Sequence, residues 1–233
     1  MRLNAVRLSA FSLAASAAML LTSAQAFAAT VIFDDFNTNQ LAVDVAYPGV
    51  SATTTIAFGA GTRTLTAHNT ASNGRAITAT TLEAQSGALS FSNNDKATGS
   101  GTLTYTNVGD ISSGPNPFFF FDIGVFDNIA NFVASATDTF GNTSTYTEVL
   151  SGAFSPTLFF SAFSGSADFN SLAKLSFMID TTNVPGSGPV RSVDGSLNSI
   201  SINAPSAVPL PAGGLLLLAG LGAIGALRRK KTV

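Results

Sequence analysis

The stretch Thr102-Leu103-Thr104-Tyr105-Thr106 alternates strictly between threonine and a larger, mostly apolar side chain. Successive side chains of a β-strand point to opposite faces of a sheet, so this pattern predicts a strand. Similar short stretches, rich in threonine and β-branched residues and bounded by Gly, Asn or Ser, recur about every eight to twelve residues, as in sandwiches and barrels. Further strands are expected at residues 31–36, 41–47, 53–58, 62–67, 76–82, 88–92, 131–139, 144–150, 157–163, 172–179 and 197–202. We therefore expect an all-β fold, an antiparallel β-sandwich with jelly-roll-like connections.

A run of four phenylalanines follows Pro117. In a strand, Phe118 and Phe120 share one face while Phe119 and Phe121 share the other. A strand that is apolar on both faces is expected in the middle of the structure, or covering a second layer. The chain has 19 Phe, three Tyr and no Trp. Sugar-binding platforms favour Trp or Tyr, so the run is interpreted as core.

Helix signals are nearly absent from residues 30–205, which we take as the folded body. Residues 168–175 fit either a helical turn or the start of a strand. A long loop is expected at 183–194, where Pro and Gly are frequent. The body is long enough for one domain with its own core.

Charge and cysteine content exclude several classes of function. The body has five cations against all 13 acidic residues, a formal charge of −8. Nucleic-acid binding requires clustered Lys and Arg, so no nucleic-acid partner is expected. The chain has no cysteine, which excludes disulfides, zinc–cysteine sites and a cysteine nucleophile.

Residues 1–29 have the pattern of a secretory signal peptide. Arg2 and Arg7 precede a short apolar stretch, and Ala26-Phe27-Ala28 forms a small-residue cleavage site. Cleavage is expected after Ala28 or Ala29. A retained N-terminal anchor is the alternative.

The C-terminal residues 206–233 carry a second targeting pattern. Its first part is the motif Val208-Pro209-Leu210-Pro211-Ala212, and its last part is the basic stretch Arg228-Arg229-Lys230-Lys231. An apolar segment, about residues 210–227, begins within the motif, ends before the basic stretch and is long enough for a transmembrane helix. The basic stretch would remain on the cytoplasmic side.

These three elements, in this order, resemble the VPLPA-type branch of the PEP-CTERM sorting signals. The resemblance covers only the tail. It implies an exported bacterial protein, transient membrane anchoring, and processing near the proline motif by an exosortase-type enzyme. It also implies a mature form at the cell surface or outside the cell, in association with exopolysaccharide and biofilm. An ordinary permanent anchor is the alternative.

Few side chains suit catalysis or metal binding. His68 is the only histidine, and we interpret it as a surface loop residue, not a catalytic base. Asp34 and Asp35 in the first strand and Asp194 before the last could together bind a structural calcium ion, because first and last strands are often neighbours. No other cofactor is expected. A glycosidase would need two facing carboxylates, and neither glutamate, Glu83 or Glu148, shows a partner in the sequence.

Three functions follow from these features. The first is an exported, non-enzymatic surface or extracellular-matrix protein. The second is a carbohydrate-binding module for exopolysaccharide, and the third is a polysaccharide hydrolase. Solvent-facing Tyr, Asn and Asp in a concave sheet would favour the second, and a facing carboxylate pair would favour the third.

Overall fold

The computed structural model describes residues 29–45, 51–70, 79–94, 97–112, 116–151 and 157–204. These ranges contain antiparallel β-strands and one short 3₁₀ helix, η1 (Phe160–Ala162). The strands are β1 (Ala29–Asp34), β2 (Gln40–Asp44), β3 (Ala52–Phe58), β4 (Gly61–Asn69), β5 (Thr80–Gln85), β6 (Ala88–Asn93), β7 (Gly99–Gly109), β8 (Phe118–Phe126), β9 (Ile129–Asp138), β10 (Thr143–Ser151), β11 (Thr157–Phe159), β12 (Ser164–Gly165), β13 (Leu172–Asp180) and β14 (Asp194–Ala204). The all-β, antiparallel fold expected from the sequence is confirmed.

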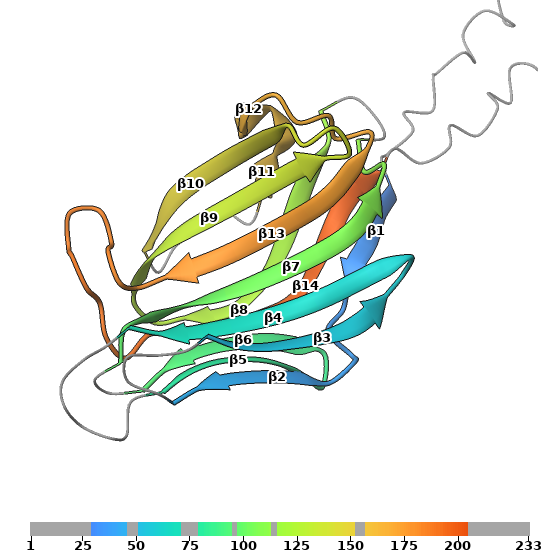
Figure 1. Cartoon of the computed structure of the whole chain (residues 1–233). Helices are drawn as coiled ribbons and strands as arrows, with labels where there is room; N and C mark the ends of the chain where they lie inside the picture. Colours follow the sequence, from blue (N-terminus) through green and yellow to red (C-terminus); the bar gives the residue numbers. More distant parts are fainter. Residues whose placement is uncertain are drawn as a thin grey trace, which may run out of the picture. The chain divides into compact units, whose positions relative to one another are not determined.

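The strands form two seven-stranded sheets that lie face to face (Figure 1). Sheet A has the order β11-β8-β14-β6-β5-β2, with β1 also paired to β14. Sheet B has the order β12-β10-β9-β13-β7-β4-β3. Phe119 of sheet A and Phe177 of sheet B meet edge to face between the layers, with ring centroids 5.3 Å apart. The molecule is therefore a β-sandwich.

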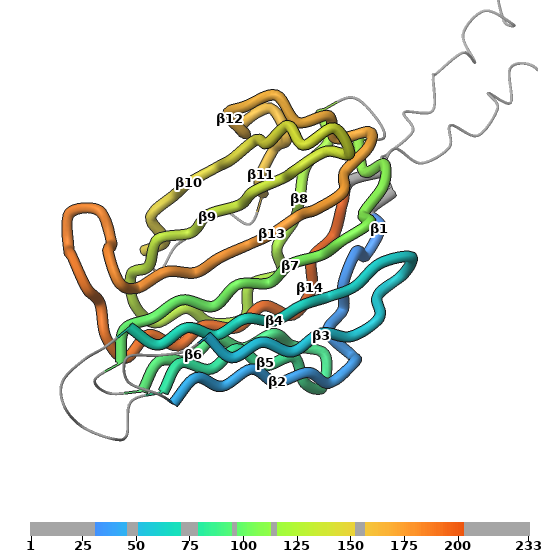
Figure 2. Tube along the Cα trace, viewed as in Figure 1, coloured from blue at the N-terminus to red at the C-terminus, as the bar shows by residue number. Residues whose placement is uncertain are grey.

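The chain crosses between the sheets repeatedly, as the colours of the trace show (Figure 2). The hairpin β3–β4 belongs to sheet B, β5–β6 returns to sheet A, and β7 crosses back to sheet B. As a result, strands that are distant in sequence become neighbours, such as β7 and β13. The first and last strands, β1 and β14, also pair.

Each strand divides its side chains between the core and the surface. In β9, Phe132, Ala134 and Ala136 are buried, and the residues between them are half-buried on the opposite face. The same alternation runs through β4 and β7, where Leu65, Leu103 and other apolar side chains enter the core. This period of two places one face of each sheet against the other sheet.

The phenylalanine run lies in β8, and its two faces separate as expected. Phe119 and Phe121 are buried in the core. Phe120 is on the outer face of sheet A and is 37% exposed. The interpretation of the whole run as core was therefore wrong for this face. The described residues form two layers, and no third layer among them covers the outer face of β8.

Some boundaries differ from the sequence-based expectations. Residues 168–171 form one hydrogen-bonded turn, in which the Asp168 carboxylate accepts from the Asn170 N–H. The strand alternative for this segment is confirmed from Leu172, where β13 begins and pairs with β7 on one side and β9 on the other. The strand expected at 157–163 ends at Phe159 and continues as η1. The strand expected at 76–82 is β5, which begins at Thr80. The two-residue strand β12 had no sequence signal.

The described strands belong to one compact unit, Ala28–Ala204. The signal peptide with Ala28, the motif 208–212, the apolar segment 210–227 and the basic stretch 228–231 lie outside the described residues and stay predictions. Ala29, the alternative cleavage position, is the first residue of β1. Among the residues that the structure describes, no helix has the length and apolar character needed to cross a membrane.

Candidate functional site

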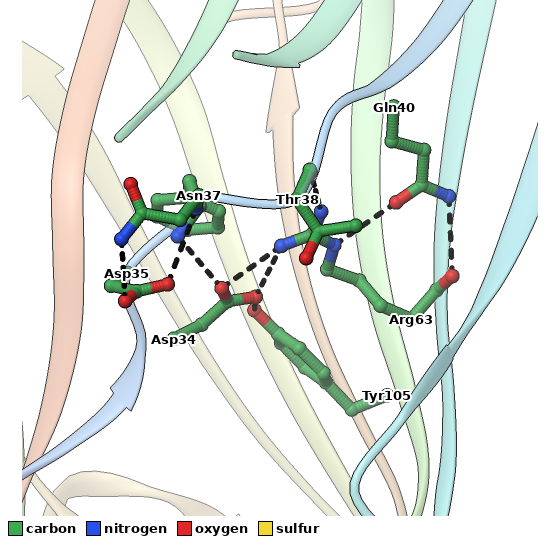
Figure 3. A network of polar contacts seen from close by, with 8 residues as sticks. Asp34, Asp35, Asn37, Thr38, Gln40, Arg63 and Tyr105 are labelled. Carbon is green, nitrogen blue, oxygen red and sulfur yellow. Dashed lines mark hydrogen bonds and ion pairs between the residues drawn. The ribbon is translucent and has the colours of Figure 1, made fainter. Parts of the chain in front are cut away.

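Asp34, one of the three expected calcium ligands, lies in a buried polar network (Figure 3). Arg63 Nη1 donates to both carboxylate oxygens of Asp34 at 2.9 Å. The Tyr105 hydroxyl donates to Asp34 Oδ2 at 2.6 Å, and the Phe36 backbone N–H donates to Oδ1 at 2.9 Å. Gln40 Oε1 accepts a hydrogen bond of 3.0 Å from Arg63 Nε.

This network leaves Asp34 no free position for a cation. An ionised carboxylate has about four lone-pair sites, and the four hydrogen bonds occupy them. Arg63 also places a positive charge where calcium would bind, and its guanidinium lies 5.6 Å from the ring centroid of Phe36. Burial first, and then the charge and hydrogen bond of Asp34, raise the pKa of Tyr105 well above its usual value, so the hydroxyl stays a donor. The network has a structural role.

Asp35 and Asp194 do not join Asp34 in one site. Although β1 and β14 pair, Asp34 lies opposite Ile200, six residues along β14 from Asp194. Six residues of strand span about 20 Å. Across the described ranges, no three His, Asp or Glu side chains are grouped so that they could hold a metal ion. The expected site built from all three carboxylates is not formed.

His68 lies in β4, so its interpretation as a loop residue was wrong. Its side chain is 39% exposed, and Nδ1 lies 3.1 Å from Ser51 Oγ and 3.9 Å from Asp44 Oδ2. A Ser-His-Asp triad needs the serine and the carboxylate on opposite ring nitrogens. Because both groups face the same nitrogen, this cluster lacks triad geometry.

The two glutamates lie in different sheets. Glu83 is on β5 between the buried residues Leu82 and Ala84, so it belongs to the outer side of sheet A. Glu148 is on β10 and accepts a 2.7 Å hydrogen bond from the Tyr146 hydroxyl. The two therefore do not form the facing pair that glycoside hydrolysis uses.

A large organised set of polar side chains is on the outer face of sheet B. At the positions that alternate with buried core residues, six neighbouring strands carry mainly threonine and serine. We call this surface the hydroxyl face. Its members are Thr53, Thr55, Thr62, Thr64, Thr66, Ser100, Thr102, Thr104, Thr106, Ser135, Thr137, Thr143, Thr145, Thr147 and Ser176.

Strand register aligns these hydroxyls in rows that cross the strands. The central row has a hydroxyl on every one of six strands, β3, β4, β7, β13, β9 and β10, without interruption. In that order it consists of Thr55, Thr64, Thr104, Ser176, Ser135 and Thr145. Neighbouring strands are about 4.8 Å apart, so the row presents one hydroxyl per 4.8 Å or so.

Hydrogen bonds between neighbours orient part of this face. Thr55 and Thr64 hydroxyls lie 2.9 Å apart, and those of Thr62 and Thr106 lie 2.8 Å apart. A hydroxyl can donate one hydrogen bond and accept two, so the Thr55–Thr64 pair keeps about one donor and three acceptor positions for a ligand. The Thr62–Thr106 pair keeps about one donor and two acceptor positions, because Thr106 Oγ1 also accepts a 3.1 Å hydrogen bond from the Thr62 backbone N–H. The face is thus both a donor and an acceptor surface.

The central row is also uncharged. Two charged residues point outward on the described parts of these strands. Lys174 lies in the row next to the central one on one side, and Asp180 lies two rows away on the other side. The row next to the central one includes Met178 and Val133. A ligand on the central row would therefore meet hydroxyl and methyl groups without a fixed charge.

The sequence contains the alternating threonines of this face, but the sequence-based predictions did not include the face itself. The alternating threonines of 102–106 were recognised as a strand pattern, and similar threonines stand in β3, β4 and β10. The missing information was register. Which threonine lies opposite which depends on pairings such as β7 with β13, far apart in the sequence.

No protein-family model matches this chain, and no curated protein matches it in sequence. Among solved structures, a family 11 carbohydrate-binding module of a cellulosomal cellulase from Clostridium thermocellum superposes with a TM-score of 0.35 and 13% identity, over 76% of this chain and 95% of the module. The solution structure of CtCBM11 gives a TM-score of 0.39 and 15% identity, over 78% of this chain and 98% of that one.

PfGH50B superposes with a TM-score of 0.39 and 10% identity, over 53% of this chain and 21% of its own length. This chain therefore spans only about a fifth of that protein. TM-scores below 0.5 do not carry a shared fold or function over to this chain. The function is accordingly inferred from its own side chains.

Proposed function

We propose that this protein is a non-catalytic polysaccharide-binding protein of the bacterial surface or extracellular matrix, and that the hydroxyl face is its binding surface. The observation that carries this proposal is the central row, an uninterrupted line of six hydroxyl-bearing side chains across six strands. The proposal combines the matrix function and the carbohydrate-binding function expected from the sequence.

The chemistry of the central row suits a neutral sugar chain. Sugar hydroxyls both donate and accept hydrogen bonds, as threonine and serine hydroxyls do. Threonine also presents a methyl group, which can pack against the C–H groups of a sugar ring. Since no charge lies in this row, a charged polysaccharide would lose hydration on binding without gaining an opposite charge, and an uncharged polysaccharide avoids this cost.

Affinity would come from repetition. A hydrogen bond to protein that replaces one to water contributes only about 0.5–1.5 kcal/mol. One hydroxyl is therefore a weak site, and a row of them becomes useful only when a polymer contacts several at once. This requirement favours a long chain over a free monosaccharide as the ligand.

Export and sorting complete the proposal. The signal peptide, cleaved after Ala28 or Ala29, would deliver the jelly-roll-like sandwich across the inner membrane. The motif Val208–Ala212, the apolar segment and the basic stretch would hold the precursor there until an exosortase-type enzyme processes it. These steps rest on the tail resemblance and on the sequence pattern.

The test compares the wild-type protein with a variant that lacks two central hydroxyls. Thr64→Val and Thr104→Val keep the β-branched shape while removing the hydroxyls, so the fold should persist. In affinity electrophoresis, a neutral β-glucan should retard the wild type, and the double variant should bind about tenfold more weakly because two hydrogen bonds are lost. Thr81→Val in sheet A is the matched control and should bind normally.

Two results would overturn the proposal. One is that no neutral polysaccharide retards the wild-type protein. The other is that the double variant and the Thr81→Val control bind equally well. Charged alginate, tested in parallel, should bind more weakly than the neutral glucan because the body is acidic.

A further inference from the structure

An apolar cavity of about 90 Å³ lies inside the sandwich, away from the hydroxyl face. Its inner wall consists of buried side chains from both sheets, among them Leu103, Phe121 and Phe177. Its outer part is lined by half-buried residues, including Ile123 and Leu197. The cavity therefore runs from the core toward the surface.

An irregular strand pairing in sheet A lies beside this space. The pairing of β8 with β14 shifts register between Gly195 and Leu197 and again between Leu197 and Ser199. Such irregularities bend a strand and interrupt close packing. At the wall of the cavity the Phe126 ring packs directly over Gly195, since a Cβ atom on Gly195 would approach Phe126 Cδ2 to 2.6 Å.

The wall contains packed aromatic rings and offers almost no hydrogen bonds. Phe121 and Phe177 meet edge to face at 5.3 Å, and Phe132 stacks on Phe177 at 6.3 Å. Of the lining residues, only Ser196 has a polar side chain, and its Oγ accepts a hydrogen bond from the Val125 N–H. Water needs about two to four polar partners in a buried site, so an apolar cavity favours an apolar guest.

We propose that this cavity binds the end of an alkyl chain from a small amphiphile, with its polar head left at the rim. The volume supports a thin guest, since benzene occupies apolar cavities of about 150 Å³ and this one is smaller. The half-buried rim supports a guest with one polar end, which can stay hydrated while the methyl end is buried. This inference is independent of the hydroxyl face.

The test uses methyl NMR spectra of the full-length protein with hexanol and with hexanediol. The two probes have the same chain length, but hexanediol would have to bury a hydroxyl without a partner. Hexanol should shift the methyl signals of Leu82, Leu103, Leu150 and Ile179, and hexanediol should leave them in place. Equal shifts with both probes, or none with either, would overturn the proposal.

A pair of variants localises the guest. Leu150→Phe adds a ring inside the cavity, so the shifts with hexanol at the other methyl groups should disappear. Val149→Phe adds the same ring on the opposite side of β10, where Val149 is 36% exposed, and should retain them. Loss in both variants, or in neither, contradicts binding in this cavity. If Leu150→Phe does not fold, the comparison of the two probes still decides the question.

Discussion

Arg63 and Asp34 form an ion pair that joins the two sheets of the sandwich. Asp34 ends β1 of sheet A, Arg63 lies in β4 of sheet B, and Nη1 is 2.9 Å from the carboxylate. Their side chains are only 1% and 2% exposed. A buried charge that keeps its partner is tolerated, whereas one that loses its partner costs the folded state several kcal/mol. The pair thus makes the packing of the two sheets depend on each partner.

Arg63→Met is expected to lower the free energy of unfolding by about 3–5 kcal/mol, because Asp34 would remain buried without its cation. Urea denaturation followed by circular dichroism measures this loss. Arg191→Met is the matched control, since Arg191 is exposed, and its effect should be small. Equal effects of the two variants would contradict the structural role of the network.

The Tyr146 hydroxyl should lose its proton at a higher pH than an ordinary tyrosine does. Burial first, and then the hydrogen bond and charge of Glu148, raise its pKa to about 12. Because the folded pKa lies above the usual value near 10, the stabilisation from Tyr146 is complete below about pH 10 and is lost as pH rises through about 12.

Ultraviolet titration of the phenolates, compared with Tyr146→Phe, should isolate this transition. Glu148→Gln removes the negative charge and should move the transition to lower pH. A Tyr146 transition near pH 10 in the folded wild type would contradict the prediction.

The hairpin between β9 and β10 should be sensitive to acid. Asp138 accepts hydrogen bonds from the backbone N–H groups of Phe140, Asn142 and Asp168, at 2.9, 2.9 and 3.1 Å, and from Asn142 Nδ2 at 2.9 Å. Burial raises the pKa of Asp138, but these hydrogen bonds outweigh it and the net pKa is lowered.

A lowered folded pKa means that stability is present above the unfolded value, about 3.9, and is lost as pH falls through the folded value. Asp138→Asn should therefore lower the melting temperature at pH 7 and reduce its fall below about pH 4. Melting curves at several pH values measure both effects. Unchanged acid sensitivity in the variant would show that other carboxylates account for it.

The sequence predicts the strands well because their signal is local. The alternation in 102–106 determines both that β7 is a strand and which side chains enter the core. Phe119 and Phe121 are placed in the core by the same period of two. The prediction that the other face of β8 is also buried was wrong, because burial of that face depends on the number of layers in the fold.

The partners of polar residues could not be read in this way. Asp34 looked like a calcium ligand because Arg63, 29 residues away, is not visible as its partner in the sequence. The hydroxyl face likewise depends on register between distant strands, as between Thr104 and Ser176. Both are products of tertiary pairing, for which local patterns hold no information.

The C-terminal tail makes a separate prediction about processing. Mass spectrometry of the secreted protein should find an N-terminus near Thr30 and no residues beyond the proline motif. An intact Arg228–Lys231 stretch on the mature surface protein would instead indicate a permanent anchor. Replacing Pro209 and Pro211 by alanine should slow processing without preventing membrane insertion, because helix could then extend into the motif.

The direction of a bound polysaccharide can be tested with threonines that share strands but not rows. Thr104 on β7 and Thr145 on β10 belong to the central row, three strand spacings or about 14 Å apart. Thr102 and Thr147 lie on the same two strands, about 7 Å away in the next row. If the chain crosses the strands along the central row, Thr104→Val and Thr145→Val should each weaken binding several-fold, and Thr102→Val and Thr147→Val should have smaller effects.

A chain that ran along one strand would give a different pattern of affinities. It would contact Thr102 and Thr104 together, because they are neighbours on the same face of β7, and it would not reach Thr145. Affinity electrophoresis of the four valine variants with one neutral β-glucan distinguishes the two directions. Equal losses in Thr102→Val and Thr104→Val, with none in Thr145→Val, would reject the crossing direction while leaving the hydroxyl face as the binding surface.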